Sequence, residues 1–134
     1  KSAVQQSLPQ LAQNTKGFFL IVEGSQIDWA AHGNDTDNLI AEMIDFDHAI
    51  GAALNFANLN QQTLVVITAD HETGGFAIDK GSVLNGPIKG GFVSTSHTGS
   101  MVPVFAYGPG AENFAGVYEN PAIFSKIKAA LELK

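Results

Sequence analysis

The sequence predicts an α/β fold built around a mostly parallel sheet with at least one antiparallel strand. Residues 18–22 and 63–69 are two largely apolar runs, the pattern of strands that are buried on both faces of a sheet. Residues 36–58 lie between them and carry apolar side chains at helical spacing, over a length that suits a crossover connection. A strand, a long helix and a second strand form a parallel βαβ unit.

The remaining segments are expected to surround this unit. Residues 2–12 are predicted to form an N-terminal helix, and the Gly-, Lys- and Ser-rich stretch 76–96 indicates a hairpin or an excursion at the sheet edge. Residues 102–107 are predicted to form a third strand. A C-terminal amphipathic helix is expected at 121–133, with Asn120 as its N-cap.

Composition limits the classes of function. At 134 residues with 45% hydrophobic content, the chain is expected to form one globular domain. A net charge of -6, with only lysine among the basic residues, argues against a nucleic-acid partner. No apolar run approaches the roughly 20 residues of a membrane span. The lack of cysteine excludes disulfides and thiolate metal sites.

Side chains that commonly bind metals follow the predicted strands. Glu23 comes directly after the first apolar run, and the pair Asp70 and His71 comes directly after the second. Loops that follow parallel strands meet at one edge of a sheet, so these groups are expected to lie close together. Asp28 and His32 are four residues apart, which places both on one face of a helical turn.

His97, in a Ser- and Gly-containing loop, completes the candidate set. It reaches the same edge only if the strand at 102–107 starts there and runs antiparallel to the other two, which is a prediction about topology. Zn²⁺ favours mixed oxygen and imidazole donors, with Mg²⁺ at carboxylate-only positions. Such donors are supplied by Glu23, Asp28, His32, Asp70, His71 and His97.

Each candidate also has an ordinary structural explanation. An acidic residue at a strand end is often a turn residue or a helix cap, and a single loop histidine is weak evidence of a site. The joint occurrence of the six favours metal binding. His48 lies within the long helix beside Asp45 and Asp47, and we interpret it as a solvent-exposed residue outside the site. Trp29 could either pack in the core or form a wall of a pocket.

Three longer motifs carry a resemblance to a known family. They are Gly-Phe-Phe-Leu-Ile-Val-Glu-Gly-Ser-Gln-Ile-Asp-Trp-Ala-Ala-His at 17–32, Ile-Thr-Ala-Asp-His-Glu-Thr-Gly-Gly at 67–75, and Ser-His-Thr-Gly-Ser at 96–100, which is followed by Val-Phe-Ala-Tyr-Gly-Pro-Gly at 104–110. In this order and spacing, the chain resembles the C-terminal part of alkaline phosphatases. The resemblance covers about Gly17 to Lys134.

The resemblance implies both a fold and a set of metal sites. The fold would be a three-layer αβα sandwich, with residues 1–134 forming the C-terminal portion of a single domain. The implied sites are a first zinc site with Asp28, His32 and His97, a second zinc site with Asp70 and His71, and a magnesium site with Glu23.

The implied activity is hydrolysis of small phosphomonoesters through a phosphoserine intermediate. In the family, the nucleophilic serine and a phosphate-binding arginine come from the N-terminal half. This sequence has no arginine, and none of its serines occupies the nucleophile position. The chain is therefore expected to be a fragment that supplies most metal ligands and is inactive alone. The resemblance further implies a homodimeric parent with a periplasmic or secreted location.

Two alternatives to this interpretation are kept open. A phosphodiesterase, sulfatase or metal-dependent mutase of the wider superfamily would use related metal sites. A non-catalytic metal-binding or assembly module would instead use an unpaired sheet edge to associate with another copy. Phosphatase activity and the mass of the chain in solution distinguish these readings.

Overall fold

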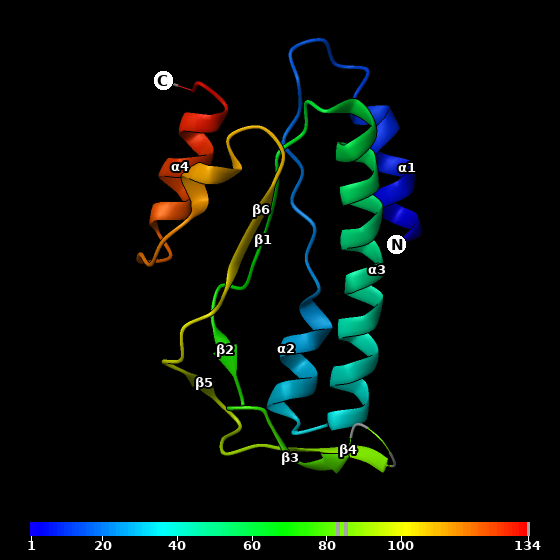
Figure 1. The fold of residues 1–134 in the computed structure, drawn as a ribbon, viewed down its shortest axis with the longest axis vertical. Helices are drawn as coiled ribbons and strands as arrows, with labels where there is room; N and C mark the ends of the chain where they lie inside the picture. Colours follow the sequence, from blue (N-terminus) through cyan, green and yellow to red (C-terminus); the bar gives the residue numbers. More distant parts are fainter. Residues whose placement is uncertain (83, 85, 134) are drawn as a thin grey trace.

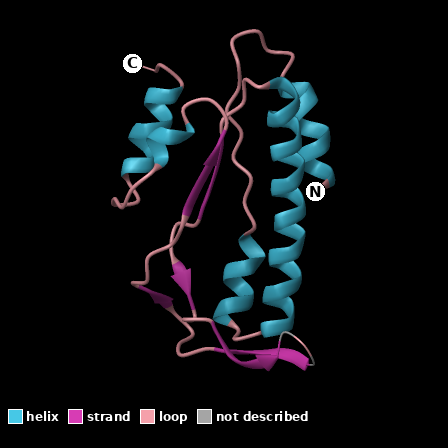
Figure 2. Ribbon diagram, in the orientation of Figure 1, coloured by secondary structure: helices cyan, strands magenta, loops and turns pink. Residues whose placement is uncertain are grey.

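The computed structural model places helices on both sides of a narrow β ribbon (Figure 1). Helices α1 and α3 lie on one side of the ribbon and α4 lies on the other (Figure 2). The structure describes residues 1–82, 84 and 86–133; Val83 and Asn85, inside the predicted hairpin, and Lys134 lie outside them. The elements in chain order are α1 (Ser2–Leu11), α2 (Ser25–His32), α3 (Thr36–Asn60), β1 (Val65–Thr68), β2 (Glu72–Thr73), β3 (Ala77–Ser82), β4 (Gly86–Gly91), β5 (His97–Thr98), β6 (Val104–Tyr107), η1 (Ala111–Phe114) and α4 (Ala122–Ala130).

The long helix α3 packs against α1, α2 and β1. It begins after Asp35, whose carboxylate accepts a hydrogen bond from the backbone N–H of Asn38 at 3.1 Å and so caps the helix. It ends where Gln61 adopts a left-handed conformation with φ of 58°. The prediction of a long helix at 36–58 is confirmed.

The cluster of buried apolar residues that forms the hydrophobic core lies between α1 and α3. Val4 and Leu8 of α1 are buried together with Ala49 of α3. Phe18 covers this cluster, and its ring meets that of Phe56 edge-on, with centroids 6.4 Å apart. The predicted N-terminal helix is therefore confirmed, and burial of its apolar face fixes it on α3.

The prediction of a fully buried strand at residues 18–22 is wrong for this chain. The segment contains no strand; Phe18 and Leu20 pack on the core, whereas Ile21 is 76% exposed. Within the described residues no neighbouring strand pairs with its backbone, so only the side facing the helices is covered. The expected parallel pairing with residues 63–69 is not formed, and the three two-stranded sheets of the described residues are all antiparallel.

The ribbon beside α3 consists of β1 and β6. These strands pair antiparallel, with Val65 opposite Tyr107 and Thr68 opposite Val104. The antiparallel direction predicted for the third strand is confirmed relative to β1; residues 18–22 form no strand, so they do not test it. Because the direction reverses, β6 begins at the end of β1 where the chain continues into the candidate ligands Asp70 and His71.

Two further strand pairs and a helix complete the fold. Strands β3 and β4 form the predicted hairpin, at the bottom of Figure 1, and β2 pairs with β5 over two residues each. Helix α4 is confirmed, but its N-cap is Pro121 rather than the predicted Asn120. The Asn120 side chain instead donates to the backbone oxygen of Asp70 at 3.3 Å. No helix in the described part of the chain has the length and apolar character to cross a membrane.

Replacing Gly51 by alanine is expected to stabilise the chain by about 0.5–1 kcal/mol, because glycine in a helix interior costs about this much relative to alanine. Gly51 lies within α3, and a Cβ there would meet no atom within 4 Å. Urea unfolding measures the gain. Gly17→Ala is the matched control: its Cβ also meets nothing within 4 Å, but its φ of 87° makes alanine unfavourable. A stabilising effect of both substitutions would contradict the backbone conformations described here.

Candidate metal centre

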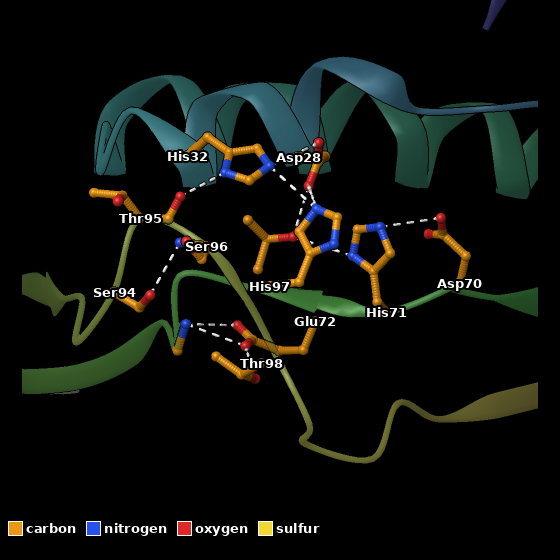
Figure 3. A network of polar contacts seen from close by, with 12 residues as sticks. Asp28, His32, Asp70, His71, Glu72, Ser94, Thr95, Ser96, His97 and Thr98 are labelled. Atoms are coloured by element: carbon orange, nitrogen blue, oxygen red, sulfur yellow. Dashed lines mark hydrogen bonds and ion pairs between the residues drawn. The ribbon is translucent and has the colours of Figure 1, made fainter.

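Four candidate ligands from three segments meet beside α2 (Figure 3). Asp28 and His32 project from one face of α2, His71 precedes β2, and His97 begins β5. The His32 Nε2 atom lies 3.2 Å from His97 Nε2 and 3.5 Å from Asp28 Oδ2. His97 Nε2 lies 3.7 Å from Asp28 Oδ1. One carboxylate and two imidazoles therefore converge on one point.

His71 joins this cluster through His97. The two imidazole rings are stacked, with centroids 3.5 Å apart and an interplanar angle of 20°. One ligand atom from each of Asp28, His71 and His97 fits within 4.8 Å of the others. His97 thus lies between His32 on one side and His71 on the other, within reach of two groups of donors.

The orientation of His32 is set by a backbone oxygen. His32 Nδ1 lies 2.6 Å from the carbonyl oxygen of Thr95. A carbonyl oxygen only accepts hydrogen bonds, so this contact places the ring proton on Nδ1. The Nε2 lone pair is left free and faces Asp28 and His97, which is the arrangement that a metal-binding histidine needs.

Thr73 orients two candidate ligands at once. Its side chain is only 9% exposed, and its hydroxyl donates to Asp28 Oδ1 at 2.6 Å. The same hydroxyl oxygen lies 3.2 Å from His71 Nδ1. Because a hydroxyl has one proton and that proton is used by the carboxylate, His71 Nδ1 must donate to Thr73. In the neutral ring His71 Nε2 then carries no proton, and it presents its lone pair as a ligand atom 3.1 Å from Asp70 Oδ2.

The position of Thr73 was not predicted from the sequence. Threonine is a poor metal ligand, so a search for metal donors passes over it. Its spacing from His71 carried a signal, because residues two apart on a strand share a face. A hydroxyl two residues after a candidate ligand can support that ligand.

The other two candidates lie at the margin of the cluster. Asp70 Oδ2 lies 3.1 Å from His71 Nε2, and the Asp70 side chain is 84% exposed. Glu23 is exposed and makes no hydrogen bond or ion pair within the described residues. The structure therefore brings Asp70 to the cluster through His71 and does not bring Glu23 into contact with it.

His48 and Trp29, which were not assigned as metal ligands, also have defined positions. His48 is exposed on α3, as predicted. Trp29 is 71% exposed, so it is not a core residue, and it lines a cavity of about 240 Å³ together with Gln26 and Asn38. That cavity lies between α2 and the start of α3 and includes none of the candidate ligands.

A further carboxylate, Glu72, lies directly beneath the cluster but does not face it (Figure 3). It accepts hydrogen bonds from the Thr98 hydroxyl and from the backbone N–H groups of Gly75 and Phe76. The bond from Thr98, followed by those from the backbone, holds the pKa of Glu72 below its usual value. Its carboxylate is therefore an acceptor that ties β2 to β5.

The centre is open to solvent. Asp28, His32 and His97 have side-chain exposures of 36%, 40% and 50%. Ion pairs this exposed contribute little to stability, so the convergence of these groups is poorly explained as a stabilising device. An accessible set of oxygen and imidazole donors is well suited to binding an ion together with a further ligand from solution.

The fold and this cluster define an α/β protein with a solvent-accessible group of metal-ligand side chains. The alkaline phosphatase family model matches residues 1–91 and 88–133. The chain therefore belongs to the alkaline phosphatase family. Its fold is the α/β fold of that family, which confirms the predicted fold class, whereas the mostly parallel sheet expected within it is not formed by the described residues.

Individual relatives agree with this assignment. Alkaline phosphatase 4 of Bacillus subtilis is 34% identical over an alignment that includes 90% of this chain and 41% of that protein. The structure of alkaline phosphatase from the Antarctic bacterium TAB5 has a TM-score of 0.90 and 43% identity, over 98% of this chain and 40% of that one. A TAB5 mutant with bound magnesium has a TM-score of 0.89 and 42% identity, over 98% of this chain and 41% of that one. The chain thus spans less than half the length of these relatives.

Proposed function

We propose that this chain supplies metal ligands to a zinc- and magnesium-dependent phosphomonoesterase. The observation that carries the proposal is the convergence of Asp28, His32 and His97, whose ligand atoms lie 3.2–3.7 Å from one another. Membership of the alkaline phosphatase family supports hydrolysis of phosphomonoesters as the activity of the whole protein. Small phosphomonoesters are the proposed substrates, and a periplasmic or secreted homodimer stays part of the proposal.

The donors fit zinc. A carboxylate oxygen and two imidazole nitrogens form a three-residue ligand set that leaves a coordination position open, as in catalytic zinc sites. His32 has its Nε2 lone pair directed inward by the Thr95 carbonyl, and Asp28 is held by the Thr73 hydroxyl. When bound, such metal ions polarise phosphoryl oxygens and lower the pKa of water. The residues of this chain hold and orient the donors for that chemistry.

The proposed metal sites differ in the number of ligands that this chain supplies. Asp70 and His71 would bind a second zinc ion, and Glu23 would contribute to a magnesium site; the magnesium bound in the TAB5 mutant supports magnesium binding in a related protein. Because affinity grows with the number of ligands, the site with three ligands should bind most tightly and the site with Glu23 alone should be weak.

The nucleophile is proposed to come from outside these 134 residues. None of the serines in this sequence lies at the position expected for it; near His97, Ser94 is half-buried and Ser96 is exposed. Ser94 Oγ is used as an acceptor for the backbone N–H of Ser96 at 2.9 Å, which is a local turn contact. The chain alone should therefore bind metal without turning over substrate.

Calorimetric titration of the metal-free chain with Zn²⁺ tests this proposal. We expect one tight site per chain, with any second site weaker by at least about tenfold, and an increase in melting temperature because the ion binds the folded state. A chelator should reverse the increase. In parallel, the zinc- and magnesium-loaded chain should show no turnover of an aromatic phosphomonoester.

The zinc titration and the activity assay test different parts of the proposal. Absence of zinc binding would remove the proposed metal centre. Two equally tight zinc ions would contradict the ranking of sites, and robust turnover would contradict an external nucleophile.

A further inference from the structure

We infer that Glu72 is a positioning residue that fixes His97 against His71 by holding Thr98. The inference deepens the proposed function and rests on it, because positioning of the two histidines matters through the metal centre. Glu72 follows His71 directly, and Thr98 follows His97 directly. A bond between the second members of these pairs therefore constrains the first members.

The connection is made by one side chain with several partners. One carboxylate oxygen of Glu72, Oε1, accepts from the backbone N–H of Gly75 at 2.9 Å and of Phe76 at 3.3 Å. The other, Oε2, accepts from Gly75 N–H at 3.1 Å and from the Thr98 hydroxyl. Glu72 thus closes the turn that follows β2 and reaches across to β5 at the same time.

The Thr98 hydroxyl has its proton available for this bond. Its oxygen lies 3.4 Å from the backbone N–H of Ser100, so the oxygen accepts from Ser100 while the proton is donated to Glu72. A hydroxyl offers one donor and two acceptor positions, so both contacts can form together. An ionised partner makes such hydrogen bonds stronger than neutral pairs.

The backbone pairing that this bond supports is short. Strands β2 and β5 pair over two residues only, Glu72 opposite Thr98 and Thr73 opposite His97. A ladder of this length has little stability of its own. One further backbone bond, from the Gly74 N–H to the Ser96 carbonyl at 3.0 Å, extends the contact, and the side-chain bond from Thr98 to Glu72 reinforces it next to His97.

The consequence for the centre is the spacing of its histidines. His71 and His97 stack with ring centroids 3.5 Å apart, although they are 26 positions apart along the chain and belong to different strand segments. Thr73 fixes His71 from the other side through its hydroxyl. With Glu72 removed, β5 would keep only its backbone bonds to this segment, and we expect it to shift and to change the distance between the two rings.

Two substitutions on opposite sides of the bond test the inference. Glu72→Ala removes the acceptor, and Thr98→Val removes only the hydroxyl while keeping a β-branched shape that suits a strand. Glu112→Ala is the matched control, because Glu112 is an exposed glutamate in η1, remote in sequence from the candidate ligands. Thr98→Val keeps the test decisive if Glu72→Ala fails to fold.

Two readouts on the 134-residue chain separate positioning from general stability. The first is the visible absorption spectrum of bound Co²⁺, which replaces zinc and reports coordination geometry. The second is the proton NMR shift of the His97 ring in the metal-free chain, which the stacked His71 ring displaces. We expect Glu72→Ala and Thr98→Val each to weaken Co²⁺ binding by about tenfold or more, to alter the spectrum and to lose the ring shift. The double variant should be no worse than Glu72→Ala alone, because Thr98→Val removes a bond that Glu72→Ala already removes.

The outcomes distinguish this inference from the proposed function. Wild-type binding and ring shift that persist in both variants would overturn the positioning role. A lower melting temperature with an unchanged cobalt spectrum and ring shift would also overturn it, since it would show a structural role only. If the wild-type chain bound no Co²⁺, the proposed centre would fail, and the ring shift would still decide whether Glu72 positions His97.

Discussion

Replacing His97 by alanine is expected to raise the zinc dissociation constant of the chain by more than about 100-fold, beyond the range produced by losing a supporting residue. His97 is the ligand candidate that links the two groups of donors: its Nε2 lies 3.2 Å from that of His32 and 3.7 Å from Asp28, and its ring stacks on His71. Without it, the best site keeps Asp28 and His32, and two ligands bind zinc weakly. Calorimetry with Zn²⁺ measures the loss.

His48→Ala provides the matched control for this experiment. His48 is exposed on α3, so its replacement removes an imidazole and leaves the cluster intact. The zinc affinity of His48→Ala should equal that of the unmodified chain. Circular dichroism should show the same helix content for all three proteins. Equal zinc affinity of His97→Ala and the unmodified chain would disprove the proposed centre, and an equal loss in both variants would point to non-specific binding by surface imidazoles.

Much of the secondary structure could be predicted from the sequence, because it depends on local patterns. The spacing of apolar residues identified α3, and the apolar runs identified β1 and β6. The segment at 18–22 has the same kind of apolar run and forms no strand here. A strand also needs a neighbour to pair with, and pairing is not encoded in the run itself. Only the side chains that meet α1 and α3 are therefore covered.

In the candidate site, too, contacts between residues close in sequence could be predicted, and most contacts between distant segments could not. The spacing of Asp28 and His32 on a helical turn is local, and the structure places them 3.5 Å apart as ligand atoms. The approach of His97 depended on the direction of β6, which was argued from topology and is confirmed. The bond from Thr73 to Asp28 and the bond from Thr98 to Glu72 join residues 45 and 26 positions apart, and no local sequence pattern predicts these two contacts.

Replacing Gly108 by alanine is expected to cost about 3 kcal/mol or more of folding free energy, because backbone strain and overpacking both act at this position. Gly108 directly follows β6 and has a φ of 103°, a conformation that alanine rarely adopts. A Cβ there would lie 2.2 Å from the backbone oxygen of Thr63 and 3.3 Å from Leu64 Cα, just before β1. Backbone cannot move aside as a flexible side chain can, so the end of the β1–β6 ribbon must separate.

Gly99→Ala isolates the effect of that close approach. Gly99 lies next to the His97 segment, has no positive φ, and a Cβ there would meet nothing within 4 Å. Its replacement should change stability by less than about 0.5 kcal/mol. Urea unfolding of both variants gives the comparison, and equal midpoints would show that Gly108 does not approach Thr63 as described. The two substitutions should also differ in their effect on the metal centre. Strand β6 pairs with β1, and Asp70 and His71 follow the end of β1. Zinc affinity should therefore fall in Gly108→Ala and be unchanged in Gly99→Ala.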